Sequence, residues 1–283
     1  MTKFEEIRLN IKSGTVSGIA FGPKTGTPIL AAHGWLDSAA SFIPLAQYLS
    51  ECRVIAVDLP GHGHSSHKPQ LGYMHFIDYV PDLVFVLDEL GWDKFILLGH
   101  SLGAAILSII AGLIPDRVTK LLCIDALGPY HASAYHLPEL MLQSINEYRM
   151  LHKKRPPSYE SMEAAIAARL KASPMKPESV KHLVDRGLKL EDDGKYRWRT
   201  DPRLLVKSLI MFSEEQITSF LSRIIAPTCL VKSTKGWPFT EESYKNRSKI
   251  IKSLEVHNID GGHHIHMDEA AKVGKIFNNF ILK

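Results

Sequence analysis

The chain has 283 residues, of which 45% are hydrophobic and 23% charged, and a formal net charge of +4. This length allows one large globular domain with an insertion, and the composition excludes a disordered or fibrous protein. The small net charge argues against a nucleic-acid-binding protein.

The N-terminal residues are charged and lack the apolar region of a signal peptide. No apolar run is long enough to cross a bilayer. The three cysteines, Cys52, Cys123 and Cys229, stand far apart without Cys-x-x-Cys spacing, which argues against a disulfide framework or a zinc site. We therefore expect a cytoplasmic protein with free thiols and no membrane span.

In chain order, short apolar strands alternate with helices on both sides of one long interruption. Strands are expected at 7–11, 16–21, 28–32, 53–57, 95–98, 118–124, 228–231 and 254–259. Helices are expected at 42–49, 76–90, 104–111, 241–251 and 267–280. Continuous apolar strands separated by helices predict a parallel sheet that is covered on both faces.

The interruption runs from about residue 129 to 225 and shows helical patterns with no convincing strand. Between 131 and 225 it holds 16 Lys and Arg against 12 Asp and Glu, which is the whole positive excess of the chain. This excess fits a solvated helix face better than a site for an anionic substrate. We therefore expect one α/β domain, residues 1–128 and 226–283, with a helical cap inserted at 129–225.

The segment Gly99-His100-Ser101-Leu102-Gly103 joins the strand at 95–98 to the helix that follows. A G-x-S-x-G sequence between a strand and a helix is the context of a nucleophile elbow. Glycines at both ends remove Cβ atoms that would collide across such a sharp turn, and the helix N-terminus directs its positive end at the chemistry. We predict that Ser101 is a nucleophile.

A serine hydroxyl needs a base to take its proton. The glycine pair Gly261-Gly262 follows an apolar strand and lets the chain turn tightly, so that the next side chain, His263, can reach over the sheet edge. We predict that His263 is the base, rather than His264 or His266, because it directly follows the glycines.

The base in turn needs a carboxylate. Asp125 ends the strand after the elbow, where open α/β sheets place their chemistry, and a carboxylate that ends an apolar strand needs a partner to justify its burial. The rivals are Glu241 and Glu242, which both look like first-turn helix residues behind a Thr240 cap. We predict that Asp125 is the acid.

Catalysis also needs donors for the oxyanion of the tetrahedral intermediate. The backbone amide of Leu102, directly after the nucleophile, is one expected donor, and the amide of Trp35, in the loop after the strand at 28–32, is the other. The Trp35 indole either lines the pocket or packs under the insertion. We also expect Trp35 and His100 to contact the substrate.

With these residues in this order, the chain resembles the α/β-hydrolase superfamily over nearly its whole length. The resemblance is carried by His33-Gly34-Trp35, the loop 58–65, the Ser101 elbow and Gly262-His263. It implies an eight-stranded, mostly parallel sheet with a helical cap after the sixth strand, a position that residues 129–225 fit.

Within the superfamily the chain is most similar to the serine-hydrolase-like proteins, relatives of haloalkane dehalogenases and epoxide hydrolases. Dehalogenase relatives that keep their acid after the sixth strand place it where Asp125 stands. Both of those enzyme classes use an aspartate nucleophile, so Ser101 disfavours their chemistry and favours acyl transfer to water.

The histidines at 62, 64 and 67, together with those at 263–266, suggest a metal site at first sight. His62 and His64 fall in the turn that the resemblance explains, and His67 lies in a polar loop, so we expect neither a metal nor a cofactor.

The expected activity is that of a serine hydrolase, most simply a carboxylesterase acting on a small or medium acyl substrate. The same triad also suits a carbon–carbon bond hydrolase or a cofactor-free perhydrolase, and some members of the fold bind ligands without catalysis. We expect a small-molecule substrate and no nucleic-acid or membrane partner. The sequence indicates neither the physiological substrate nor an oligomeric state.

Overall fold

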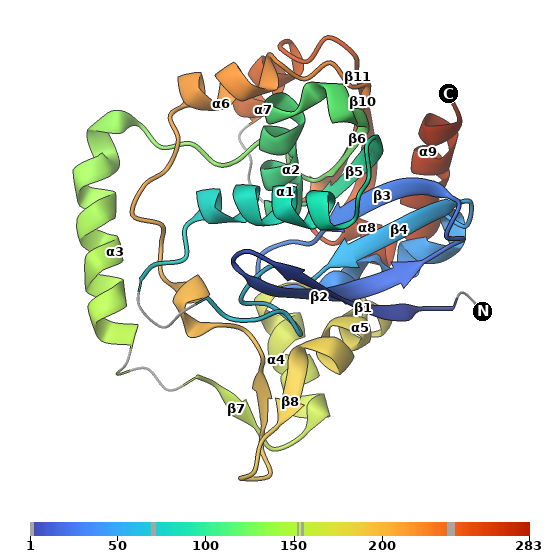
Figure 1. The fold of residues 1–283 in the computed structure, drawn as a ribbon. Helices are drawn as coiled ribbons and strands as arrows, with labels where there is room; N and C mark the ends of the chain where they lie inside the picture. Colours follow the sequence, from blue (N-terminus) through green and yellow to red (C-terminus); the bar gives the residue numbers. More distant parts are fainter. Residues whose placement is uncertain (1–2, 69–71, 152, 154–155, 237–240) are drawn as a thin grey trace.

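An eight-stranded sheet runs through the centre of the molecule in the computed structural model, with the strand order β1-β2-β4-β3-β5-β6-β10-β11 (Figure 1). The structure describes residues 3–68, 72–151, 153, 156–236 and 242–283, together with the backbone of residue 241. The strands of this sheet are β1 (Glu5–Ile11), β2 (Gly14–Phe21), β3 (Thr27–Ala32), β4 (Cys52–Val57), β5 (Phe95–His100), β6 (Val118–Ile124), β10 (Thr228–Lys235) and β11 (Leu254–Gly262).

The sheet is mostly parallel, as the sequence predicts. The β1–β2 and β2–β4 pairs are antiparallel, and the other five neighbouring pairs are parallel. The carboxyl ends of the central strands therefore lie at one edge of the sheet, which is where such sheets place their chemistry.

Helices cover both faces because the strands are apolar on both. In β3, Leu30 and Ala32 belong to one buried cluster, and Ile29 and Ala31 belong to the other. Each large apolar side chain buried in this way contributes about 1.5–3 kcal/mol. The helices on the first face are α1 (Tyr79–Glu89), α2 (Leu102–Leu113) and α6 (Glu214–Leu221), and those on the second are the 3-10 helix η1 (Ala39–Tyr48), α8 (Ile265–Asp268) and α9 (Ala270–Leu282).

Several expected helices differ in detail from the sequence analysis. The helix expected at 42–49 is the 3-10 helix η1, and Pro44 inside it lacks the amide that an α-helical hydrogen bond needs. The helix expected at 76–90 is divided into a short 3-10 turn, η2 (Phe76–Asp78), and α1. The helix α7 (Glu241–Ser248) is shorter than the expected 241–251.

Residues 129–225, called the inserted segment from here on, leave the sheet after β6 and return to it at β10. Its elements are η4 (Ala134–His136), α3 (Leu137–Leu151), β7 (Ser158–Tyr159), α4 (Met162–Ala172), α5 (Pro177–Gly187), β8 (Leu188–Leu190), β9 (Tyr196–Trp198), η5 (Pro202–Leu205) and α6. The expectation that this segment has no strand is wrong, because β7, β9 and β8 form a small antiparallel sheet. Strands of two or three residues are too short to show an alternating pattern.

The inserted segment has its own apolar cluster, in which Val180 and Val184 of α5 pack with Ala165 of α4. Its last helix behaves differently, since Ile217 and Leu221 of α6 are buried in the large cluster beside the central sheet. The boundaries expected for the cap stay a prediction.

Two buried ion pairs join the inserted segment to loops that follow β3 and β4. Arg169 of α4 pairs with Asp37, and Arg186 of α5 pairs with Asp58, with Nε at 3.0 Å from both carboxylate oxygens and Nη2 at 2.8 Å from Oδ2. Asp58 also accepts the backbone amide of Ala39 at 2.8 Å. Burial alone would raise the pKa of Asp58, but the hydrogen bonds and charge of Arg186 hold it below its ordinary value.

Arg186→Gln should lower the free energy of unfolding at pH 7 by about 3–5 kcal/mol, because it leaves the Asp58 carboxylate buried without its counter-charge. The pKa of Asp58 is lower in the folded state, so the pair stabilises above the unfolded-state pKa of about 3.9 and the contribution is lost as the pH falls through the folded-state value. Urea denaturation measured from pH 7 down to pH 2 should therefore show that the free energies of unfolding of the wild type and of Arg186→Gln converge in acid.

Arg197→Gln is the matched control, since Arg197 pairs with Asp193 on the exposed surface. It should leave the unfolding midpoint unchanged. Equal effects of the two substitutions would contradict the role given to the buried pair.

Candidate active site

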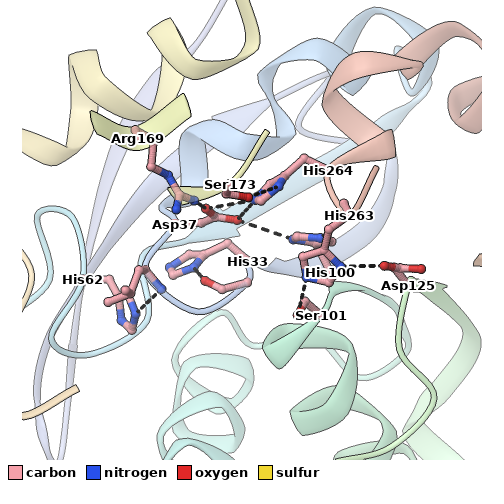
Figure 2. Close-up of polar contacts among 12 residues, drawn as sticks. His33, Asp37, His62, His100, Ser101, Asp125, Arg169, Ser173, His263 and His264 are labelled. Carbon is pink, nitrogen blue, oxygen red and sulfur yellow. Dashed lines mark hydrogen bonds and ion pairs between the residues drawn. The ribbon is translucent and has the colours of Figure 1, made fainter. Parts of the chain in front are cut away.

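Three side chains from different strand ends meet at the carboxyl edge of the sheet (Figure 2). Ser101 follows β5, Asp125 follows β6, and His263 follows β11. His263 Nε2 lies 2.9 Å from Ser101 Oγ, and His263 Nδ1 lies 2.5 Å from Asp125 Oδ2. The structure thus brings together the three residues that the sequence analysis predicted as nucleophile, base and acid, and these roles stay predictions.

Ser101 sits in a strained turn between β5 and α2. Its backbone has φ 49° and ψ −113°, a region that a residue with a side chain rarely adopts. The turn is held by the Ser101 amide, which donates to the Ile124 carbonyl at 2.9 Å. Glycine is required on both sides: a Cβ on Gly103 would lie 1.9 Å from the Ala32 carbonyl oxygen, and one on Gly99 would lie 2.4 Å from the backbone of α2.

Asp125 is buried and held in one orientation. Its side chain is 2% exposed, and Oδ1 accepts hydrogen bonds from the amide of Ser233 at 2.9 Å and from its hydroxyl at 2.7 Å. The other oxygen, Oδ2, faces His263. With Nδ1–H donating to Asp125, the Nε2 lone pair of His263 is directed at the Ser101 hydroxyl, which is the tautomer that a general base needs.

The sequence analysis missed Ser233, because it ended this strand at Val231, whereas β10 continues to Lys235. Among the rival acids, Glu242 is exposed on α7. The side chain of Glu241 and the expected Thr240 cap lie outside the described residues.

The expected oxyanion donors lie at two turns beside Ser101. Leu102 is the first residue of α2, and Trp35 lies in the turn after β3, which the Asp37 amide closes on the Gly34 carbonyl at 3.1 Å. The Trp35 side chain is 47% exposed, and its Nε1 donates to the Leu204 carbonyl of the inserted segment at 3.0 Å. The Trp35 indole therefore contacts the inserted segment, which is one of the two placements that the sequence analysis left open. The roles of both amides stay predictions.

The expectation that His100 contacts the substrate is wrong for this structure. Its side chain is fully buried, because the rings of His264 and His266 pack against it. Its Nε2–H donates to the His263 carbonyl at 2.9 Å. Burial lowers the pKa of His100 to about 4, so the imidazole is neutral at pH 7.

A second polar group lies behind the base and was not found from the sequence. Asp37 accepts a hydrogen bond from Arg169 Nη2 at 2.6 Å and lies 3.1 Å from His264 Nε2. Burial would raise the pKa of the Asp37 carboxyl, but His264, His100 and Arg169 together hold it well below its usual range. His264 therefore anchors the loop that carries the neighbouring His263.

His62 of the loop 58–65 and His33, which follows β3, have structural roles in this arrangement. The Leu36 amide donates to His62 Nε2 at 3.2 Å, and the Leu59 amide donates to His33 Nε2 at 3.0 Å. Burial lowers the pKa of His62 to about 3, so it too is neutral.

Comparison with known proteins finds close similarity over the whole chain. Residues 27–151 match the alpha/beta hydrolase fold family. The chain is 30% identical to a serine hydrolase-like protein of Dictyostelium discoideum, over 99% of this chain and 82% of that protein. It is 31% identical to a probable serine hydrolase of Drosophila melanogaster, over 93% of this chain and 83% of that protein.

A solved structure is similar over the same extent. The crystal structure of a hypothetical protein from Pseudomonas aeruginosa PAO1 is 34% identical in sequence and superimposes with a TM-score of 0.93. The similarity covers 99% of this chain and 100% of that one.

Asp125→Asn should cut kcat on an ester substrate by about 10⁴-fold while the protein stays folded, because an amide at this position favours the wrong histidine tautomer. Steady-state kinetics gives the rate, and circular dichroism checks the fold. Glu242→Gln is the control and should cost little. If Asp125→Asn stays near the wild-type rate, the acid is elsewhere.

Proposed function

The chain belongs to the alpha/beta hydrolase fold family, in its serine hydrolase-like branch, and from this premise we propose that it hydrolyses carboxylic esters of small or medium acyl chains. The single observation that carries the proposal is the hydrogen-bonded series from Ser101 through His263 to Asp125. The names of the relatives support a serine hydrolase, and the ester class is our own inference from the chemistry of the residues.

In the first half of the proposed reaction, Ser101 Oγ attacks the ester carbonyl carbon while His263 Nε2 takes the hydroxyl proton. Asp125 stabilises the imidazolium that forms. The backbone amides of Leu102 and Trp35 donate to the oxyanion. The tetrahedral intermediate collapses as the bond to the alkoxy group breaks, and His263 returns the proton to the leaving alcohol.

In the second half, water attacks the acyl-enzyme carbonyl and His263 takes a proton from it. The second tetrahedral intermediate expels Ser101 Oγ, which receives this proton from His263, so that the acid product leaves and the enzyme returns to its starting state. Since the strained turn already fixes Ser101 in an attacking orientation, little reorganisation is needed at the moment of reaction.

We further propose that the protein acts in a reducing compartment, the cytoplasm. Cys52, Cys123 and Cys229 are all buried free thiols, which suits a setting where disulfides do not form. No helix in the described part of the chain is both long and apolar enough to span a membrane.

Wild-type protein should hydrolyse a p-nitrophenyl ester series with a preference for short or medium acyl chains, and a fluorophosphonate probe should label it covalently. Ser101→Ala and His263→Ala should each retain less than about a thousandth of the activity, because the two residues act as one unit. Release of p-nitrophenol measures ester hydrolysis, and intact mass measures covalent labelling by the probe.

His257→Ala removes a half-buried histidine of β11, which faces Glu255, and serves as the control for this series. It should keep full activity and labelling. A wild-type protein that neither hydrolyses any ester nor reacts with the probe would instead be a ligand-binding member of the family.

A further inference from the structure

Three metal-ligating groups converge behind the proposed base. The Asp37 carboxylate, His100 Nδ1 and His264 Nε2 lie within 4.8 Å of one another, and all three residues are buried. Asp37 Oδ2 is 3.1 Å from His264 Nε2 and 3.5 Å from His100 Nδ1. Figure 2 shows His264 and His100 approaching the same carboxylate from different elements.

His100 Nδ1 is the atom that a hydrogen-bonded network alone does not explain. His100 is completely buried, and its Nδ1 lies 3.5 Å from Asp37 Oδ2, which is too far for a well-formed hydrogen bond. Because Nε2–H donates to the His263 carbonyl, the lone pair of the neutral ring lies on Nδ1 and points toward a negatively charged oxygen. Buried polar atoms without a partner are rare and need an explanation.

A cation between the nitrogen and the carboxylate would supply that explanation. Histidines that bind metals commonly donate their second ring N–H to a carboxylate or a backbone carbonyl, which fixes the ring and its tautomer. His100 already has this arrangement.

We propose that Asp37, His100 and His264 form a binding site for zinc or a similar divalent transition-metal ion. Zinc bonds of about 2.0–2.2 Å in tetrahedral geometry place ligand atoms about 3.3 Å apart. The two nitrogen–oxygen distances, 3.1 and 3.5 Å, lie on either side of that value. Imidazole ligands favour zinc, copper or nickel over magnesium, which prefers oxygen.

Arg169 competes with the metal for the same carboxylate. Its guanidinium contacts Oδ1 at 2.6 Å from the inserted segment, and its side chain is 13% exposed. A metal on Oδ2 therefore has a positive charge close by, which weakens its binding. The affinity of the site is set partly by this one side chain.

Metal binding should also reach the catalytic centre, a consequence that rests on the proposed function. His264 is the neighbour of His263 in the chain, and His100 holds the His263 carbonyl. Drawing the His100 and His264 nitrogens together around an ion shifts the backbone that positions the base. Small misplacements of a catalytic group cost large factors in rate, so zinc should lower kcat and leave KM unchanged.

The test is isothermal titration calorimetry of the metal-free full chain with zinc, and with magnesium for comparison. We expect one zinc per chain and no magnesium binding. His264→Gln should weaken zinc binding about 100-fold or more because it removes a ligand. Its matched control, His257→Gln on β11, should leave zinc binding unchanged.

Two further variants make the result decisive even if His264→Gln misfolds. Arg169→Gln should tighten zinc binding about tenfold, because it removes the competing cation. His263→Gln should bind zinc as the wild type does. Unchanged affinity in folded His264→Gln or in Arg169→Gln would overturn the proposal, and loss of zinc in His263→Gln would place the ion on the catalytic residues instead.

The metal site and the proposed function can fail separately, because calorimetry measures zinc binding without any substrate. Zinc binding with the expected variant effects, in a protein that hydrolyses no ester, would support the metal site and reject the esterase. In an active protein, saturating zinc should lower kcat about tenfold or more. An unchanged kcat with zinc bound would overturn the link between the site and the base.

Discussion

The close approach of α2 to the sheet is the constraint on which the rest of the site depends. Gly99 and Gly103 permit it, since a Cβ at either position would collide with neighbouring backbone. The amide of Ser101 then reaches the carbonyl of Ile124, the residue that directly precedes Asp125. One tight packing contact therefore positions Ser101 and the strand end that carries Asp125, and Ser233 on β10 fixes the orientation of the Asp125 carboxylate.

Charge pairing in the interior sets how the inserted segment meets the sheet. Asp37 and Asp58 follow neighbouring strands, β3 and β4, and each is met by an arginine from the insertion. An unpaired charge at either place would be strongly unfavourable in a buried setting. These two contacts therefore favour the placement of the insertion in which both carboxylates are paired.

The sequence was most informative where strands end. Ser101, Asp125 and His263 could each be found because a reactive side chain follows an apolar run, and a parallel sheet brings such positions to one edge. The pairing of Asp37 with Arg169 joins residues 132 positions apart and depends on how the insertion packs, so no local pattern predicts it. The burial of His100 was not predicted because it depends on packing against His264 and His266, which lie far away in the sequence and leave no local pattern. The strands β7, β8 and β9 are too short to leave a periodic signal.

The left-handed backbone at Ser101 has a consequence for evolution. A residue with a side chain at φ 49° costs about 1–3 kcal/mol of conformational strain, and glycine at the same position would relieve most of it. Drift toward higher stability would therefore tend to replace this serine. With the proposed role of Ser101 as the nucleophile, its presence means that selection for reactivity outweighs selection for stability at this turn.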